Sequence, residues 1–403
     1  MRRGTRLVFG AMTGTSADGV DVAAVRVRGK GVRVRGELLS LHSSPLGSLA
    51  ERIRRAQQQT PMTTGEFAAL ARDIAIAHLA PMREAAARHG QPDLIVAHGQ
   101  TLFHAPPLSL QLIDPFLIAQ EFGCSVLCGL RGADLAAGGE GAPITPLADW
   151  MLFRSRSSTR AVVNLGGFIN ATLIPPRQRD DSTWISGVRG FDVCLCNQLL
   201  DHLARTRAHC AFDKGGALAL RGRADATKAR AAADRLDAQR TQGRSLGTAD
   251  ELARTMGDAL ATLAPEDAIA TAIEAIARAL THALDAAWPR TSRTRGAKLL
   301  LAGGGAHNLA LVAAITRTTG LATTTTAEFG VDIGAREALA MALLGAAASD
   351  GADITLPAVT RRGDLHCAHG TSVRQRAIFT RTSHSDPSLP TTLCETRSLT
   401  NPE

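Results

Sequence analysis

The sequence is poor in aromatic residues and contains no tyrosine. Aromatic side chains make up 3% of the 403 residues. Proteins that bind single-stranded nucleic acid stack bases on such side chains, so this function class is disfavoured. The net charge of +8 comes from scattered arginines and not from one basic block. We therefore expect no nucleic-acid partner.

Long apolar runs and paired cysteines are also missing. No apolar run approaches the roughly 20 residues needed to span a bilayer, and the start of the chain does not resemble a signal peptide. The seven cysteines show no paired spacing, which fits a reducing compartment better than a disulfide framework. We expect a cytoplasmic enzyme with no membrane partner, long enough for about two to three domains.

Several nucleotide-binding and hydrolase motifs are absent. The chain has no G-x-x-x-x-G-K-[ST], which excludes a P-loop as the phosphate cradle. Gly303-x-Gly305-x-x-Asn308 lacks the third glycine of a dinucleotide fingerprint, so a Rossmann oxidoreductase is a poor fit. The G-x-S-x-G elbow and the protein-kinase catalytic loop are missing as well.

Glycine turns follow three predicted strands. The strands cover residues 7–12, 162–165 and 298–302, and their turns contain Gly14 and Gly19, Gly166-Gly167 and Gly303-Gly304-Gly305. Each of the first two turns leads into another strand, so two hairpins lie about one domain length apart and predict a duplicated α/β fold. Glycine lets backbone N–H groups approach phosphate, and together the turns favour a nucleotide site. The first, taken alone, equally fits an ordinary hairpin turn.

Helical patterns separate these strands. Thr63 and Glu66 form a capping-box pattern that starts a helix, which we expect Pro81 to interrupt and Gly90 to end. Residues 197–288 are mostly helical in pattern and include one apolar stripe at helical spacing. The stripe comprises Ile269, Ile273, Ile276, Leu280 and Leu284.

Asp192 is the candidate acid–base group. It stands at the start of a predicted helix, after a loop rich in Gly and Ser, where a carboxylate can face a cleft and accept a proton from a hydroxyl or water. An N-cap aspartate is the alternative interpretation. Cys194 and Cys196 lack a second ligand pair, so we expect buried free thiols and no certain metal ligands.

Two polar loops are candidates for substrate binding. His98-Gly99-Gln100-Thr101 follows a buried strand, and residues 131–141 form a charged, glycine-rich loop. Loops at strand ends often carry binding residues on α/β scaffolds, and a sugar is bound by many directional hydrogen bonds. A structural loop histidine and a flexible connector are the alternative interpretations.

These motifs, in this order, resemble the anhydro-N-acetylmuramic acid kinase family over about residues 6–360. The segment 10–21, Gly-Ala-Met-Thr-Gly-Thr-Ser-Ala-Asp-Gly-Val-Asp, resembles the family signature G-x-M-S-G-T-S-x-D-G-[IV]-D. Further matches are segments 98–101, 134–143, 164–167, 213–214, 303–308 and 336–340. The resemblance implies a two-lobed actin/hexokinase-like ATPase fold with duplicated ribonuclease-H-like domains and an interdomain cleft.

The resemblance also implies an activity. Members use ATP and water to convert 1,6-anhydro-N-acetylmuramic acid into N-acetylmuramic acid 6-phosphate during peptidoglycan recycling. Mg²⁺ accompanies ATP, Asp192 is the general base, and a homodimer is expected. The residues expected to bind ATP are Gly14, Thr15, Ser16, Ala17, Asp18, Gly19, Val20, Asp21, Asn164, Gly166, Gly167, Gly303, Gly304, Gly305 and Asn308. Those expected at the sugar are His98, Gln100, Arg131, Asp134 and Glu337.

The chain departs from the family pattern beside the expected base. Residues 191–197 read Phe-Asp-Val-Cys-Leu-Cys-Asn, where the family usually has F-D-T-G-P-G-N. Two alternatives therefore stay open: a catalytically weakened nucleotide-binding relative, and a kinase for another amino sugar. We expect an N-terminal lobe at 1–145, a C-terminal lobe at 146–360 and a disordered tail at 361–403, where serine, threonine and proline replace the periodic pattern.

Overall fold

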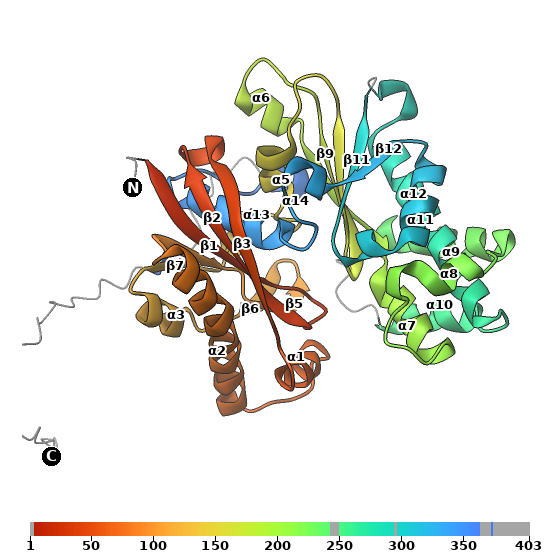
Figure 1. Cartoon of the computed structure of the whole chain (residues 1–403), viewed down its shortest axis with the longest axis horizontal. Helices are drawn as coiled ribbons and strands as arrows, with labels where there is room; N and C mark the ends of the chain where they lie inside the picture. Colours follow the sequence, from red (N-terminus) through yellow and green to blue (C-terminus); the bar gives the residue numbers. More distant parts are fainter. Residues whose placement is uncertain (1–3, 242–249, 294–295, 363–371, 374–403) are drawn as a thin grey trace, which may run out of the picture.

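Two β-sheets divide the chain into two lobes, which lie side by side in Figure 1. The structure is a computed structural model and describes residues 4–241, 250–293, 296–362 and 372–373. The expected disordered tail at 361–403 lies almost wholly outside the described residues. The expectation of a mixed α/β protein is confirmed.

The first sheet begins with an antiparallel meander. Strands β1 (Thr5–Thr13), β2 (Gly19–Arg28) and β3 (Arg35–Pro45) pair in sequence. Strand β4 (Leu94–Ala97) then pairs parallel to β1, and β7 (Ser125–Leu127) pairs parallel to β4. The short β13 (Ser372–Val373) adds to β7, which gives the order β13-β7-β4-β1-β2-β3. A separate hairpin consists of β5 (Gln100–Ala105) and β6 (Leu108–Leu112).

The second sheet repeats this plan. Strands β8 (Arg160–Leu165), β9 (Phe168–Ile174) and β10 (Arg189–Leu195) form the meander. Strands β11 (Lys298–Ala302) and β12 (Ala322–Thr325) continue it in parallel, in the order β10-β9-β8-β11-β12. In both sheets the third, second, first, fourth and fifth strands are neighbours in that order. This duplicated ribonuclease-H-like topology confirms the predicted two-lobed ATPase fold.

Helices cover both sheets. Those of the first half are α1 (Leu49–Gln57), α2 (Thr64–His89), α3 (Pro115–Phe122), α4 (Gly132–Ala136) and α5 (Pro146–Phe153). The second half has α6 (Asp181–Ser186), α7 (Asn197–Arg207), α8 (Ala217–Arg221), α9 (Ala226–Thr241), α10 (Asp250–Ala259), α11 (Pro265–Ala287), α12 (Leu309–Thr319), α13 (Arg336–Ser349) and α14 (Pro357–Thr360). Short 3-10 turns are Gly31–Arg33, Lys214–Gly216, Arg290–Ser292, Gly304–His307 and Thr326–Phe329. The predicted apolar stripe of α11 is buried throughout.

Helix α13 returns to the first lobe although it follows both sheets in sequence. It packs on β1, β2 and β4, and Figure 1 shows it beside β1 and β2. The approach is so close that a Cβ on Gly10 would lie 2.0 Å from the Ala338 carbonyl oxygen. Side chains of β1, α5, β8 and α13, among them Val8, Trp150 and Val162, share one apolar cluster. The division at residue 145 stays a prediction. Helix α13 lies beyond that residue in the sequence but packs on the first sheet.

Helix α2 corrects one expectation from the sequence. Its capping box forms as predicted: the Glu66 N–H donates to Thr63 Oγ1 and the Thr63 N–H donates to Glu66 Oε2. The helix, however, continues without a break through Pro81 and ends at His89. Buried residues on both sides of the proline, including Ile74 and Met82, pack on the first sheet's core. This packing outweighs the roughly 3 kcal/mol that an internal proline costs a helix.

Candidate functional site

The first candidate segment, residues 14–21, forms the turn between β1 and β2 and the start of β2. Ala17 adopts a left-handed conformation with φ of 53°, and its N–H donates to the Gly14 carbonyl oxygen at 3.1 Å. Thr15, Ser16 and Asp18 are exposed, so hydroxyl and carboxylate groups line the outside of the turn. This arrangement suits the expected contact with phosphate.

Asp21 lies at the base of this turn on β2. The Ser43 hydroxyl donates to Asp21 Oδ1 at 2.5 Å. Burial raises the pKa of Asp21, which the Ser43 hydrogen bond opposes and the nearby Asp18 carboxylate reinforces. A carboxylate that is disfavoured as an anion in this way is stabilised by any cation that binds beside it.

Two glutamine side chains donate hydrogen bonds to backbone carbonyl oxygens of the turn. Gln100, which is fully buried, donates from Nε2 to the Gly14 carbonyl oxygen at 3.1 Å. Gln57, at the end of α1, donates from Nε2 to the carbonyl oxygens of Thr15 and Thr101, both at 3.1 Å. Gln100 was expected at the sugar, and its observed contact is with the turn. The role of Gln57 carries no sequence signal, because its partners lie more than 40 residues away.

His98 and Arg131 form a second group next to β4. The Arg131 Nε–H donates to His98 Nε2 at 3.0 Å, and His98 Nδ1 lies 2.9 Å from the Gly99 carbonyl oxygen. His98 therefore carries its proton on Nδ1. Burial, with the adjacent Arg131 charge, lowers the pKa of His98 to about 3, so the imidazole is neutral. Both ring nitrogens of His98 are therefore engaged within the protein, and its expected contact with the sugar stays a prediction.

Asp134 is committed to its own loop. Its Oδ2 accepts the Gly141 N–H at 2.8 Å, and its Oδ1 accepts the Thr360 hydroxyl at 2.8 Å. Arg131 reaches the same loop by donating to the Gly141 carbonyl oxygen at 2.8 Å. The structure thus gives Asp134 a loop-fixing role, and its expected contact with the sugar stays a prediction.

Asp192 lies within strand β10 and not at a helix N-terminus, which corrects both its expected placement and the N-cap alternative. Asp192 pairs with Asn170 across to β9, and the register shifts between Asp192 and Cys194. Such a bulge re-aims a side chain and is frequent beside active sites. Burial raises the pKa of Asp192 to about 6, against the lowering effect of the Arg131 charge.

Arg131 connects the acidic groups of both lobes. Burial lowers the pKa of Arg131 to about 10, while the charges of Asp192 and Glu337 oppose that shift. Glu337, in the first turn of α13, has a pKa raised by burial and by the neighbouring Asp21 charge, with Arg336 and Arg131 acting against the rise. The charges of Asp21, Arg131, Asp192 and Glu337 are thus coupled at one place between the sheets.

Asn164 connects the glycine turns of the second lobe with this charged group. Its Nδ2–H donates to Glu337 Oε1 at 3.3 Å. A Cβ on Gly303 would lie 2.8 Å from Asn164 Oδ1, and one on Gly305 would lie 2.9 Å from the Leu165 carbonyl oxygen. The two turns therefore pack so closely that side chains would not fit. Asn308, expected at ATP, caps α12 by accepting the Leu311 N–H at 3.0 Å.

Three features were not anticipated from the sequence. One is Gln57. The second is a buried ion pair in which Arg336 of α13 donates to both carboxylate oxygens of Asp149 on α5, at 2.8 and 2.5 Å. The third is Asp201 on α7, whose pKa burial raises to about 6 with help from the Asp18 charge of the first lobe. All depend on contacts between distant segments, which local patterns do not reveal.

The cysteines behave as expected from the sequence. Cys194 and Cys196 are buried free thiols, and burial raises the pKa of Cys196 to about 12. In the described part of the chain, no group of three or more His, Cys, Asp and Glu side chains is placed to hold a metal ion. Nor does any described helix have the length and apolar character needed to cross a membrane.

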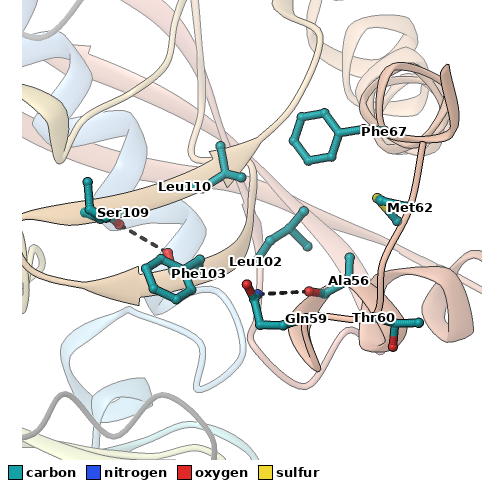
Figure 2. A pocket seen from close by; sticks show the side chains of 10 residues that line it. Ala56, Gln59, Thr60, Met62, Phe67, Leu102, Phe103, Ser109 and Leu110 are labelled. Atoms are coloured by element: carbon teal, nitrogen blue, oxygen red, sulfur yellow. Dashed lines mark hydrogen bonds between the residues drawn. The ribbon is translucent and has the colours of Figure 1, made fainter. Parts of the chain in front are cut away.

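An apolar pocket of about 460 Å³ lies on the first lobe, away from the charged groups. Figure 2 shows side chains from α1, the start of α2 and the β5–β6 hairpin around it. Its lining includes Met62, Phe67, Leu102 and Leu110. The lining is mostly apolar, with Gln59, Thr60 and Ser109 as its polar side chains, whereas a polyhydroxylated sugar needs many directional polar partners. The charged group between the sheets is therefore the candidate active site.

Comparison with known proteins points to one family. A profile of the family "Anhydro-N-acetylmuramic acid kinase" matches residues 6–367. Proteins of that name from Synechococcus sp. strain CC9902 and Parasynechococcus marenigrum are 34% and 36% identical, over 83% and 84% of this chain and 91% and 92% of theirs. Component A of the (R)-2-hydroxyglutaryl-CoA dehydratase of Acidaminococcus fermentans is 12% identical, covering 86% of this chain and 99% of its own, with a TM-score of 0.42.

Proposed function

This chain belongs to the anhydro-N-acetylmuramic acid kinase family, and we propose that it catalyses the reaction named by that family. It would open the 1,6-anhydro bridge of anhydro-N-acetylmuramic acid with water and transfer the γ-phosphoryl group of ATP to O6. The products are N-acetylmuramic acid 6-phosphate and ADP. Membership in a kinase family implies ATP as the phosphoryl donor. The observation that carries the proposal is the charged group shared by both lobes, in which Asn164 of β8 donates to Glu337 of α13 at 3.3 Å and the Arg131 charge acts on Asp192 of β10.

Asp192 is the proposed general base. With a pKa of about 6, it is mostly ionised at neutral pH and still basic enough to accept a proton as water attacks the anomeric carbon. The bond between C1 and O6 breaks as the new C–O bond forms, as in inverting glycoside hydrolysis. Strain in the bicyclic sugar favours this opening. The released O6 then attacks the γ-phosphorus, and ADP leaves.

Arg131 holds the groups around the sugar. Its charge keeps the pKa of Asp192 from rising further, so the base stays ionised in a buried setting. Its hydrogen bond to Nε2 fixes the tautomer of His98, whose Nδ1–H donates to the Gly99 carbonyl oxygen. Glu337, which accepts from Asn164, is the second carboxylate proposed beside the sugar.

The turn at 14–21 and the glycine turns of the second lobe are proposed to bind ATP from two sides. Backbone N–H groups and the hydroxyls of Thr15 and Ser16 can donate to phosphate oxygens. The close packing of Gly303 and Gly305 on β8 places their backbone beside Asn164. Phosphoryl transfer depends mainly on positioning and charge neutralisation, which these turns would supply.

The acidic groups of the turn fit a magnesium ion. Mg²⁺ commonly uses one or two carboxylates and takes its remaining ligands from substrate phosphates and water. Asp21 has a raised pKa and lies under the influence of Asp18, so a cation is favoured there. We propose that Asp18 and Asp21 hold Mg²⁺, which would neutralise charge on the transferred phosphoryl group. The homodimer, the absence of nucleic-acid and membrane partners, and the cytoplasmic location remain predictions.

Sugar-dependent ADP release tests the proposed reaction. The purified chain is incubated with ATP, Mg²⁺ and 1,6-anhydro-N-acetylmuramic acid, in parallel with Asp192→Asn and with Asp258→Asn, an exposed control. We expect turnover in the parent and the control, and a loss of roughly 100-fold or more in Asp192→Asn. Equal activity in Asp192→Asn would exclude it as the base. Absence of turnover in the parent, with ATP bound, would favour the catalytically weakened relative.

A further inference from the structure

Gln57 spans two segments of the candidate site with one amide group. Its Nε2 donates to the carbonyl oxygen of Thr15 in the β1–β2 turn and to that of Thr101 in β5, both at 3.1 Å. A primary amide has two N–H donors, and both are used here. Gln57 is only half-buried, yet it reaches two backbone acceptors that lie 42 and 44 residues away in sequence.

A second amide completes the arrangement. Gln100 donates from Nε2 to the Gly14 carbonyl oxygen at 3.1 Å and lies 3.4 Å from the Thr101 carbonyl oxygen. The carbonyl groups of Gly14 and Thr15 are therefore turned toward these amides, below the exposed side of the turn. Because successive peptide groups in a turn are coupled, fixing two carbonyls restricts where the N–H groups of the same turn point. The turn also contains Ala17 in the left-handed region, which is costly for a residue with a Cβ.

We propose that Gln57 is a positioning residue, which holds the 14–21 turn in its ATP-binding conformation and in register with the 98–101 segment. This inference rests on the proposed function, which assigns the turn to ATP and the 98–101 segment to the sugar. Gln57 acts through the backbone of Thr15, so its loss would weaken ATP use without removing a group that touches the reacting atoms.

The role of Gln57 can be tested separately from the apolar pocket that lies beside α1. Ala56 and Gln59, on either side of Gln57, line the apolar pocket (Figure 2), whereas Gln57 is not part of that lining. A substitution at residue 57 therefore replaces no side chain of the pocket lining. Gln58, the next residue, is exposed and provides a matched control on the same short segment.

The first test compares Gln57→Met with Gln58→Ala in steady-state kinetics. Methionine keeps the length of the side chain but donates no hydrogen bond. Loss of two hydrogen bonds at their usual net strength predicts a fall in kcat/KM for ATP of roughly 10- to 30-fold in Gln57→Met. Gln58→Ala should match the parent. A value for Gln57→Met within twofold of the parent, in a protein that melts at the parent's temperature, overturns the proposal.

A second variant separates hydrogen bonding from packing. Gln57→Glu has the same shape as the parent side chain, but its carboxylate faces two carbonyl oxygens and cannot donate to them. When protonated, it regains one O–H donor. We expect the ratio of kcat/KM for ATP between Gln57→Glu and Gln57→Met to rise as the pH falls from 8 to 5. A ratio that does not change with pH overturns a positioning role through hydrogen bonds.

Binding without catalysis separates this inference from the proposed function. The affinity of a non-hydrolysable ATP analogue with Mg²⁺ is measured by calorimetry for the parent, Gln57→Met and Gln58→Ala. If the parent binds the analogue but does not use the sugar, the proposed reaction fails. The role of Gln57 then stands if Gln57→Met binds the analogue roughly 10-fold more weakly than the parent. Equal affinities overturn it.

Discussion

Replacing Arg131 by methionine should move the acid limb of the pH–rate profile upward. Burial raises the pKa of Asp192 to about 6, and the Arg131 charge is the largest influence acting in the opposite direction. Removing a nearby opposite charge raises a carboxyl pKa by roughly 1 to 2 units. At pH 6 the ionised fraction of Asp192 would then fall by about 5- to 50-fold, whereas at pH 9 it would fall by less than about 2-fold.

The assay is kcat/KM for the anhydro sugar between pH 5 and pH 9, which reports groups of the free enzyme. Arg131 also donates to His98 and Gly141, and losing those contacts lowers activity equally at every pH. Arg131→Lys keeps the charge and should leave the acid limb near its parent position. Glu140→Gln should shift the limb slightly downward, because the Glu140 charge raises the pKa of Asp192. An unshifted limb in Arg131→Met would refute the coupling of Arg131 to the base.

Two further substitutions test the packing around the site. Gly305→Ala should cost about 1–3 kcal/mol in urea unfolding and weaken ATP-analogue binding, because the new Cβ would lie 2.8 Å from Leu165 Cβ. Gly304→Ala is the control, since its Cβ would lie 3.8 Å from the nearest atom, and equal stability of the two variants would contradict this packing. Arg336→Met should lower the free energy of unfolding by about 3–5 kcal/mol, because it leaves the Asp149 carboxylate buried without its partner. Adding Asp149→Leu should recover part of that loss, and a double variant no more stable than Arg336→Met would argue against the buried pair.

Local patterns in the sequence predict the elements that carry the turns. The glycine turns after β1, β8 and β11 each combine a short apolar run with Gly, which is a local signal. The sequence places Asp192 at the start of a helix, because the segment from Asn197 onward is helical in pattern. The structure corrects this placement by pairing Asp192 with Asn170 in the second sheet. The bulge beside it is a property of two strands and has no signature in one.

Long-range contacts explain what the sequence could not predict. Helix α13 reads as an apolar, alanine-rich segment, and nothing in that composition indicates that it packs on a strand more than 300 residues earlier. The continuation of α2 past Pro81 likewise depends on burial against the first sheet, which overrides a strong local preference. The amide contacts of Gln57 depend on α1 lying beside both Thr15 and Thr101.

In the proposed reaction, water activated by Asp192 opens the anhydro bridge, and the γ-phosphoryl group of ATP is transferred to O6. Running the reaction in H₂¹⁸O and quenching it after about one turnover tests this claim most directly, with the product alone in H₂¹⁸O as the control for exchange. We predict one ¹⁸O atom on the anomeric carbon and none in the phosphate group. Label in the phosphate group, or a sugar phosphate with no label, would contradict the account.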